Sequence, residues 1–190
     1  MKNIAIFASG NGTNCENIIR YFSSSKEINI SIVVCNNKKA KVIERAKRYN
    51  VPVCIISKEE LDDEEKFLQI LKEHDVSIIV LAGFMLFIPT YLTQAYPKGI
   101  INIHPSLLPK YGGKGMYGMH VHEAVRLNHE KESGITIHYV NNEYDKGQII
   151  RQHSVSLSES DTAEDIAQKV HNLEYKYFPE TIEEILKEKE

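Results

Sequence analysis

Asn102 and His104 stand two residues apart at the end of an apolar run, and Pro105 follows at once. Residues two apart on an extended chain point to the same side, so the amide and the imidazole would face one point. An amide donor beside a titratable ring can serve as an oxyanion hole with an acid–base group. The other interpretation is a rigid turn that happens to hold two polar side chains. The spacing alone does not decide between them.

A histidine that works as a cation needs an anionic partner, and Asp145 is the candidate for that role. It lies in the polar segment 141–147, between two stretches of alternating polarity. The alternative is a turn-forming aspartate ahead of Lys146 and Gly147, which is a common arrangement. The sequence does not show whether Asp145 and His104 are neighbours in space.

A cluster of small residues, GNGTN at positions 10–14, follows the first apolar run. At the start of a helix, such a loop can offer backbone N–H groups and the positive end of the helix to a phosphate. A dinucleotide fingerprint is disfavoured, because Cys15 holds its third glycine position and Asn36 and Asn37 stand where an acid would bind a ribose. A single phosphate monoester fits best, and a plain strand-to-helix turn is the alternative.

The composition and the remaining motifs disfavour several other functions. The chain has 190 residues and a net charge of −3, which is not the basic signature of a nucleic-acid binder. Its apolar runs are too short to cross a bilayer, and its start does not resemble a signal peptide. Cys15, Cys35 and Cys54 are widely spaced, which favours a cytoplasmic protein with reduced thiols. His120 and His122 lack a third ligand at a suggestive spacing, so we expect no metal.

The candidate residues need a scaffold, and the hydrophobic pattern predicts one. Strand-like and helix-like segments alternate, which is typical of a doubly wound, mostly parallel α/β sheet. The expected strands are 3–8, 30–35, 53–56, 77–82 and 99–103, and the expected helices are 14–22, 40–49 and 60–74. The strand at 77–82 is the most apolar, so we expect it near the centre. Ligands bind outside the carboxyl ends of such strands, where the loops SGNGTN, AGFMLF and NIHPS converge.

The pattern changes after residue 110. A helix is expected over 121–128, and residues 134–140 and 148–155 alternate with period two. Two such segments joined by a polar turn predict an antiparallel strand addition. No linker marks a second domain, so we expect a single domain over residues 1–190.

The tail predicts a long C-terminal helix. Asp161 is its expected N-cap, and Glu164 would complete a capping box. Pro179 lies inside the helical pattern and should kink the helix or end it.

Four motifs, ASGNGTN, VLAGFM, NIHPSLLPKY and EYDKGQII, occur in this order along nearly the whole chain. Together they resemble the phosphoribosylglycinamide formyltransferase family, and the GNGTN loop is similar to the phosphate loop of that branch. The resemblance implies a Rossmann-like formyltransferase fold. It also implies formyl transfer from 10-formyltetrahydrofolate, a co-substrate, to the amine of 5-phosphoribosylglycinamide in purine biosynthesis. No metal, nucleic acid or membrane is implied, and we expect a monomer or a homodimer.

The resemblance also implies roles for individual residues. Asn102, His104 and Asp145 fall on the catalytic positions: Asn102 and a protonated His104 would stabilise a tetrahedral intermediate, and Asp145 would raise the pKa of His104 and keep it charged. The substrate positions are Gly12, Thr13 and Asn14 at the phosphate, with Glu174 and, one helical turn earlier, His171 at the glycinamide end. The folate positions are Met85, Leu86, Phe87, Ile88, Asn102, Asn141, Asn142, Glu143, Tyr144 and Asp145. The N-terminal half would thus bind the phosphate substrate and the C-terminal half the folate.

The chain departs from the family pattern in four places, one of them a folate-side Arg of some members that has no clear match near Asp62. Leu86 stands where many members have Arg, and Lys146 stands where many have a Gly that would allow a positive φ. The segment Gly112–His120 is longer than in the shortest members and is either a mobile flap or a lengthened loop. The competing hypotheses are another formyltransferase of this fold, such as an amino-sugar or tRNA enzyme, a formyl-folate hydrolase, and a binding module without turnover.

Overall fold

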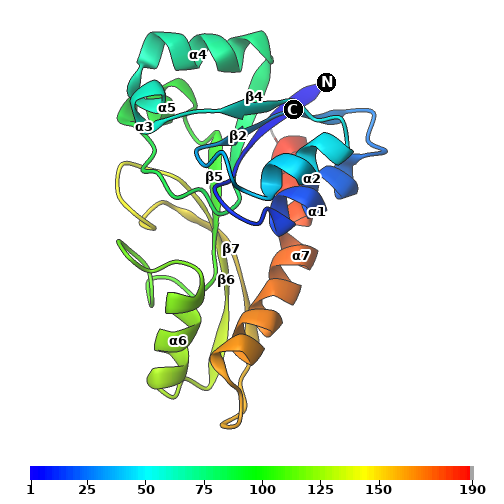
Figure 1. The fold of residues 1–190 in the computed structure, drawn as a ribbon. Coiled ribbons are helices and arrows are strands. Elements are labelled where there is room, and N and C mark those ends of the chain that lie inside the picture. Colours follow the sequence, from blue (N-terminus) through cyan, green and yellow to red (C-terminus); the bar gives the residue numbers. More distant parts are fainter. Residues whose placement is uncertain (189–190) are drawn as a thin grey trace. The chain divides into compact units, whose positions relative to one another are not determined.

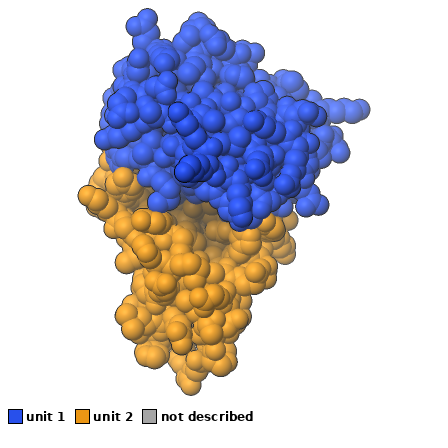
Figure 2. Space-filling model, viewed as in Figure 1, with its two compact units in different colours: residues 1–102 blue, residues 103–190 orange. Residues whose placement is uncertain are grey.

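The computed structural model of the chain describes residues 1–188. The chain divides into two compact units, residues 1–102 and residues 103–190, coloured blue and orange in Figure 2. The expectation of a single domain stays a prediction.

The strands form a mostly parallel sheet, as the sequence pattern predicts. They are β1 (Lys2–Phe7), β2 (Ile28–Cys35), β3 (Val53–Ile55), β4 (Val76–Leu81), β5 (Ile100–His104), β6 (Glu132–Tyr139) and β7 (Ile149–Ser156). Their order is β3-β2-β1-β4-β5-β6-β7, so β4 is central, as expected from its apolar sequence. The pairs among β1 to β5 are parallel, whereas β6 and β7 pair antiparallel. The predicted fold class is confirmed.

The first unit places helices on both faces of its parallel strands (Figure 1). These helices are α1 (Thr13–Phe22), α2 (Val42–Arg48), α3 (Lys58–Asp62), α4 (Glu64–Glu73) and α5 (Thr90–Ala95), the last of which the sequence analysis did not predict. Phe7 of β1 is fully buried and meets Phe67 of α4 and Phe84 edge-on, with ring centroids 5.8 and 5.2 Å apart. This aromatic cluster fixes the position of the loop that leaves β4.

The prediction of one helix over residues 60–74 is wrong, because the segment forms two helices. Ser57 and Glu60 form a capping box that starts α3. At Asp63 the backbone is extended, with ψ near 91°, and the Asp63 carboxylate accepts from the N–H of Lys66 at 3.2 Å. Asp63 therefore ends α3 and caps α4, and the charged residues that follow it lie in the first turn of α4.

We expect Asp63→Ala to lower the free energy of unfolding by about 1 kcal/mol, because an N-cap is lost. Asp62→Ala is the matched control, since Asp62 is also exposed but caps no helix. Urea unfolding of the two variants measures the difference. Equal stabilities would show that the Asp63 cap contributes nothing.

The second unit holds the antiparallel pair β6-β7 and two helices, α6 (Met119–Leu127) and α7 (Ala163–Glu188). α7 packs on both strands and also meets α6. Its apolar residues recur at helical spacing and form the buried face, which includes Ile166, Val170, Phe178, Ile182 and Ile185. The predicted strand addition and the long C-terminal helix are both confirmed.

One detail of the predicted C-terminal helix is wrong. The capping box is formed by Thr162 and Asp165, not by Asp161 and Glu164: the Asp165 N–H donates to Thr162 Oγ1, and the Thr162 N–H donates to Asp165 Oδ2. The hydroxyl and the carboxylate of this pair satisfy each other's backbone donors. Of the two alternatives for Pro179, an end of the helix is excluded, because α7 runs on to Glu188. A kink at Pro179 stays a prediction. Buried side chains on both sides of Pro179 hold the last turns in place.

None of the helices within residues 1–188 combines the length and the apolar character needed to cross a membrane. Cys15, Cys35 and Cys54 are free thiols.

Candidate active site

Ser9 joins the carboxyl ends of three strands in the first unit. Its N–H donates to the carbonyl of Gly83 at 3.0 Å, beyond β4. Its hydroxyl donates to Asn36 Oδ1 at 2.5 Å, beyond β2, and accepts from the N–H of Met85 at 2.8 Å. The segments 10–14 and 85–88, both predicted to bind ligands, thus leave the sheet at one edge, where parallel α/β sheets bind their ligands.

Gly12 gives the loop before α1 its shape. Its φ is +75°, a conformation that favours glycine, and a Cβ here would lie 2.5 Å from the side chain of Val42. No side chain caps α1, so the first backbone N–H groups of Thr13 and Asn14 lie at the positive end of a ten-residue helix. This arrangement suits an anion, and the phosphate role of Gly12, Thr13 and Asn14 stays a prediction.

The segment Phe84–Ile88 lies partly in the core and partly in solvent. Phe84 packs on Phe7, and Ile88 is buried. Met85 and Phe87 are exposed by 46% and 40%, while Leu86 between them is partly buried. Two large apolar side chains in solvent at a strand end fit a surface that covers a flat apolar ligand.

Strand β5 carries both residues with which the sequence analysis began. Asn102 pairs with Leu81, the last residue of β4, and His104 ends β5. Alternation along the strand puts the two side chains on one side of the sheet. Asn102 is partly buried, and His104 is 4% exposed.

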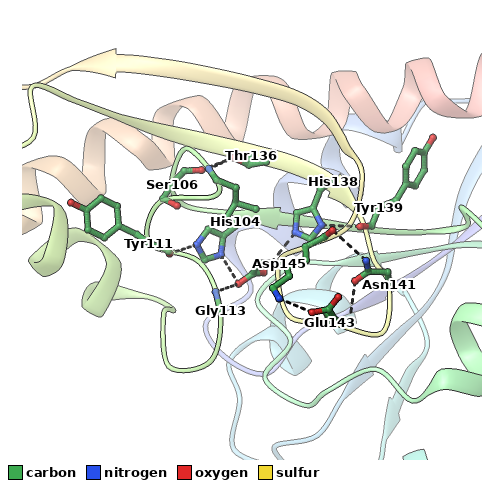
Figure 3. Close-up of polar contacts among 12 residues, drawn as sticks. His104, Ser106, Tyr111, Gly113, Thr136, His138, Tyr139, Asn141, Glu143 and Asp145 are labelled. Carbon is green, nitrogen blue, oxygen red and sulfur yellow. Dashed lines mark hydrogen bonds and ion pairs between the residues drawn. The ribbon is translucent and has the colours of Figure 1, made fainter.

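Asp145 lies between two buried histidines in the second unit (Figure 3). Its Oδ2 is 3.6 Å from Nδ1 of His104 and accepts from the N–H of Gly113 at 2.9 Å. Its Oδ1 is 3.7 Å from Nε2 of His138 on β6. The structure therefore brings Asp145 to His104, as the sequence analysis expected. It also adds His138, which the sequence analysis missed although this residue lies on a predicted strand.

Backbone carbonyls orient both rings. Nε2 of His104 lies 2.7 Å from the carbonyl of Tyr111, and Nδ1 of His138 lies 2.9 Å from the carbonyl of Tyr139. A carbonyl accepts only, so each of these nitrogens carries the proton and donates it. In the neutral ring of His104, the nitrogen that faces Asp145 is therefore the unprotonated one. Nδ1 of His104 can take up a proton beside the carboxylate.

Burial lowers the pKa of His104, and this outweighs Asp145 and the Tyr111 carbonyl, which both raise it. Asp145 raises the pKa of His104, as the sequence analysis expected, but burial lowers this pKa more strongly. The expectation that Asp145 keeps His104 charged stays a prediction. The desolvation of an imidazolium in this buried position exceeds the attraction of the carboxylate. For Asp145, burial raises the pKa, but contacts with His138, His104 and the Gly113 N–H together lower it.

These shifts predict that the protein loses stability as the pH falls below 6.5. Burial lowers the pKa of His104 and of His122 from the ordinary 6.5, so the unfolded chain takes up protons first. Unfolding then becomes easier as acid is added, and above pH 6.5 the effect vanishes. Asp145, with its lowered pKa, adds a loss in the same direction as the pH falls through and below its ordinary 3.8.

Urea unfolding across this range, with His122→Gln beside the wild type, measures the effect. His122 is buried, and its Nδ1 has no hydrogen-bond partner among the described residues. As the pH drops below 6.5, the free energy of unfolding should fall less steeply in this variant than in the wild type. His129→Gln changes an exposed histidine and should follow the wild type. If His122→Gln leaves the pH dependence of the free energy of unfolding unchanged, His122 does not contribute to the loss of stability.

The loop that follows His104 is fastened to β6. Thr136 Oγ1 donates to the carbonyl of Ser106 at 2.7 Å and accepts from the N–H of Leu108 at 2.9 Å (Figure 3). Gln152 on β7 donates to the carbonyl of Leu108 at 3.0 Å. Thr136 is fully buried, so these bonds are costly to break. They hold in place the loop whose Tyr111 carbonyl orients His104.

His171 and Glu174 lie together on α7, as their spacing predicts. Nδ1 of His171 is 2.9 Å from Glu174 Oε2, and both side chains are partly buried. The Glu174 carboxylate also raises the pKa values of His104 and His122, although burial lowers both more strongly. Glu174 is thus electrostatically coupled to the histidines of the same unit.

The segment 141–146 is an exposed turn built on Asn141. Asn141 Oδ1 accepts from the N–H of Glu143 at 3.0 Å, and its Nδ2 donates to the carbonyl of Lys146 at 3.3 Å. The residue with a positive φ in this turn is Asp145, at +54°, and not Lys146. Aspartate tolerates this conformation better than most residues. Lys146 lies in solvent and pairs with Glu143, so the departure at this position leaves the turn intact.

Among the residues that the structure describes, no three His, Cys, Asp or Glu side chains gather as a metal site would require. His120 is exposed and His122 is buried, although they lie two residues apart on α6. The expectation that no metal takes part stays a prediction.

The chain belongs to the formyl transferase family, whose model matches residues 2–182. It is 39% identical over 191 residues to the phosphoribosylglycinamide formyltransferase of Bacillus subtilis (strain 168), covering 98% of this chain and 95% of that protein. It is 37% identical to the chloroplastic phosphoribosylglycinamide formyltransferase of Arabidopsis thaliana, of which it spans 66%. The crystal structure of phosphoribosylglycinamide formyltransferase from Bacillus halodurans matches with a TM-score of 0.88 at 36% identity, covering 100% of this chain and 97% of that one. The predicted family is confirmed.

Proposed function

We propose that the protein transfers the formyl group of 10-formyltetrahydrofolate to the amine of 5-phosphoribosylglycinamide. The observation that carries the proposal is Asp145 beside His104, at the end of the strand that holds Asn102. An orienting carboxylate, an acid–base group and an amide donor are what acyl transfer to an amine requires. The similarity to relatives of that name supports this choice of substrates.

In the proposed mechanism, the substrate amine attacks the formyl carbon, a C–N bond forms, and negative charge develops on the formyl oxygen. The amide of Asn102 donates to that oxygen. The Nε2–H of His104 does so too, once it leaves the carbonyl of Tyr111. As the charge develops, His104 takes up a proton from water, and Asp145 stabilises the resulting imidazolium. The proton returns to water when the oxyanion collapses. The bond from the formyl carbon to N10 then breaks, and the proton lost by the amine reaches N10, through water ordered by Asp145.

The proposal assigns the remaining residues as the resemblance implies. The substrate phosphate binds at Gly12, Thr13 and Asn14, and the glycinamide end binds at Glu174, which His171 orients. The folate binds along Met85–Ile88 and along Asn141–Asp145, the second of which joins the folate site to the catalytic carboxylate. The proposed partners of all these residues are thus small molecules.

A spectroscopic assay tests the proposal. The purified protein is mixed with 10-formyltetrahydrofolate and 5-phosphoribosylglycinamide, and release of the deformylated folate is followed. We expect release that depends on the glycinamide substrate. Release without it would replace the proposal with a hydrolase, and release with an amino sugar alone would indicate another acceptor. A protein that binds the folate without turnover would be a binding module.

A further inference from the structure

Arg45 on α2 directs its guanidinium at the loop before α1. Its Nε–H donates to the backbone carbonyl of Asn11 at 2.8 Å, and its Nη2 donates to Asn11 Oδ1 at 3.1 Å. Its Nη1 forms an ion pair with Glu16 in the first turn of α1. All three nitrogens thus contact one short segment, although Arg45 lies about thirty positions away in the chain.

The same helix contacts the loop with its backbone. The N–H of Val42 donates to the carbonyl of Gly10 at 3.2 Å, and the side chain of Val42 fills the space that a Cβ on Gly12 would need. α2 therefore holds the loop at two points, through the backbone N–H of Val42 and through the guanidinium of Arg45. A planar guanidinium holds a peptide carbonyl and a side-chain oxygen at fixed angles, which a lysine cannot do.

Glu16 creates an electrostatic problem that Arg45 solves. Its carboxylate stands in the first turn of α1, at the end of the helix where we propose that an anionic phosphate binds. A negative charge favours the helix N-terminus in the absence of a ligand, but it repels a second anion at the same end. The side chains of Arg45 and Glu16 are only 23% and 19% exposed, so solvent screens the repulsion incompletely, and the ion pair cancels it.

We propose that Arg45 is a positioning residue for the phosphate of the substrate. It fixes the peptide of Asn11, so that the N–H groups that follow point to one place, and it neutralises Glu16. Its polar atoms are directed at Asn11 and Glu16 rather than at the ligand. The inference rests on the proposed function, because it takes the loop at residues 10–14 to be the phosphate site.

Steady-state kinetics test the proposal. Arg45→Gln should raise KM for 5-phosphoribosylglycinamide by about ten- to a hundredfold, the size of effect that lost charged hydrogen bonds produce. The kcat and the KM for the formyl folate should change little. Arg48→Gln removes the same charge from an exposed position on the same helix and is the matched control. A general loss of structure would lower kcat and the melting temperature instead.

Two further variants separate charge from shape. Arg45→Lys keeps the charge but not the fork, so it should recover only part of the lost affinity. Adding Glu16→Gln to Arg45→Gln removes the carboxylate that has lost its partner and should recover the electrostatic part of the lost affinity. The substrate analogue without its phosphate should be used equally well by the wild type and by Arg45→Gln. Equal KM values for the phosphorylated substrate in both proteins, or an equal loss for both substrates, would overturn the inference.

Binding of inorganic phosphate gives a result that does not depend on turnover. Amide chemical shifts of Gly12 and Thr13 should move on phosphate addition in the wild type and much less in Arg45→Gln. Wild-type protein that binds phosphate here without formyl transfer would reject the proposed function and leave the role of Arg45 standing. Equal phosphate binding by both proteins would reject the role of Arg45 whatever the activity.

Discussion

His104→Ala is expected to lower kcat for formyl transfer by about 10²- to 10³-fold, the effect of removing one donor to a developing oxyanion. The KM values should change little, because the interaction with His104 strengthens only as charge develops on the formyl oxygen. His104 is 4% exposed, so the truncation also leaves a small cavity. Comparing kcat and KM for both substrates in the wild type and the variant measures the effect.

His104→Gln is the companion variant, since it fills more of the space and keeps an amide donor without acid–base function. It should recover stability without recovering most of kcat. His129→Gln changes an exposed histidine of the same unit and should leave kcat unchanged. Near-full activity of His104→Ala would remove His104 from the mechanism, and a loss confined to KM would make it a binding residue only.

Asp145→Asn is expected to lower kcat by about 10³- to 10⁴-fold, comparable to the loss of a carboxylate that orients a catalytic histidine. The amide can still accept from the N–H of Gly113, but it can no longer stabilise an imidazolium at His104. Because the carboxylate raises the pKa of His104, its removal should lower that pKa further. Kinetics and a titration of the His104 ring by NMR measure the two effects separately.

Glu123→Gln is the matched control for Asp145→Asn, because it removes an exposed carboxylate from the same unit at a position with no proposed role in binding or catalysis. It should change neither kcat nor the His104 titration. If Asp145→Asn lowers kcat while the pKa of His104 stays in place, the carboxylate acts on water or on substrate rather than through the imidazole. If neither quantity changes, Asp145 has no role in the reaction.

The alternation of short apolar strands with helices was enough to predict the sheet. β4, the most apolar strand, is central, because a strand buried on both faces has no polar side. The predicted helix boundaries were wrong where a single side chain determines where a helix ends. Asp63 divides a continuous helical pattern, and periodicity does not show whether an aspartate points to solvent or caps a helix.

For the candidate site, the sequence predicted the residues that lie in compact motifs and missed those that act from elsewhere. Asn102 and His104 share a strand, so their spacing was informative. His138, Thr136 and Arg45 lie on other elements, and only the fold brings them to Asp145, to the His104 loop and to the loop at residues 10–14. The net pKa of His104 also required the structure, because burial cannot be read from spacing.

Ser9 has a consequence for how the protein handles two ligands. One hydroxyl bonds to the backbone at Met85, and the peptide that follows Ser9 begins the loop at residues 10–14. A ligand that shifts Met85 either weakens this hydrogen bond or shifts Ser9, and with it Gly10 at the start of that loop. Thermodynamic reciprocity then requires that occupation of either segment change the affinity of the other by the same factor. If the two substrates bind at these segments as proposed, we expect them to bind with synergy or antagonism, and not independently.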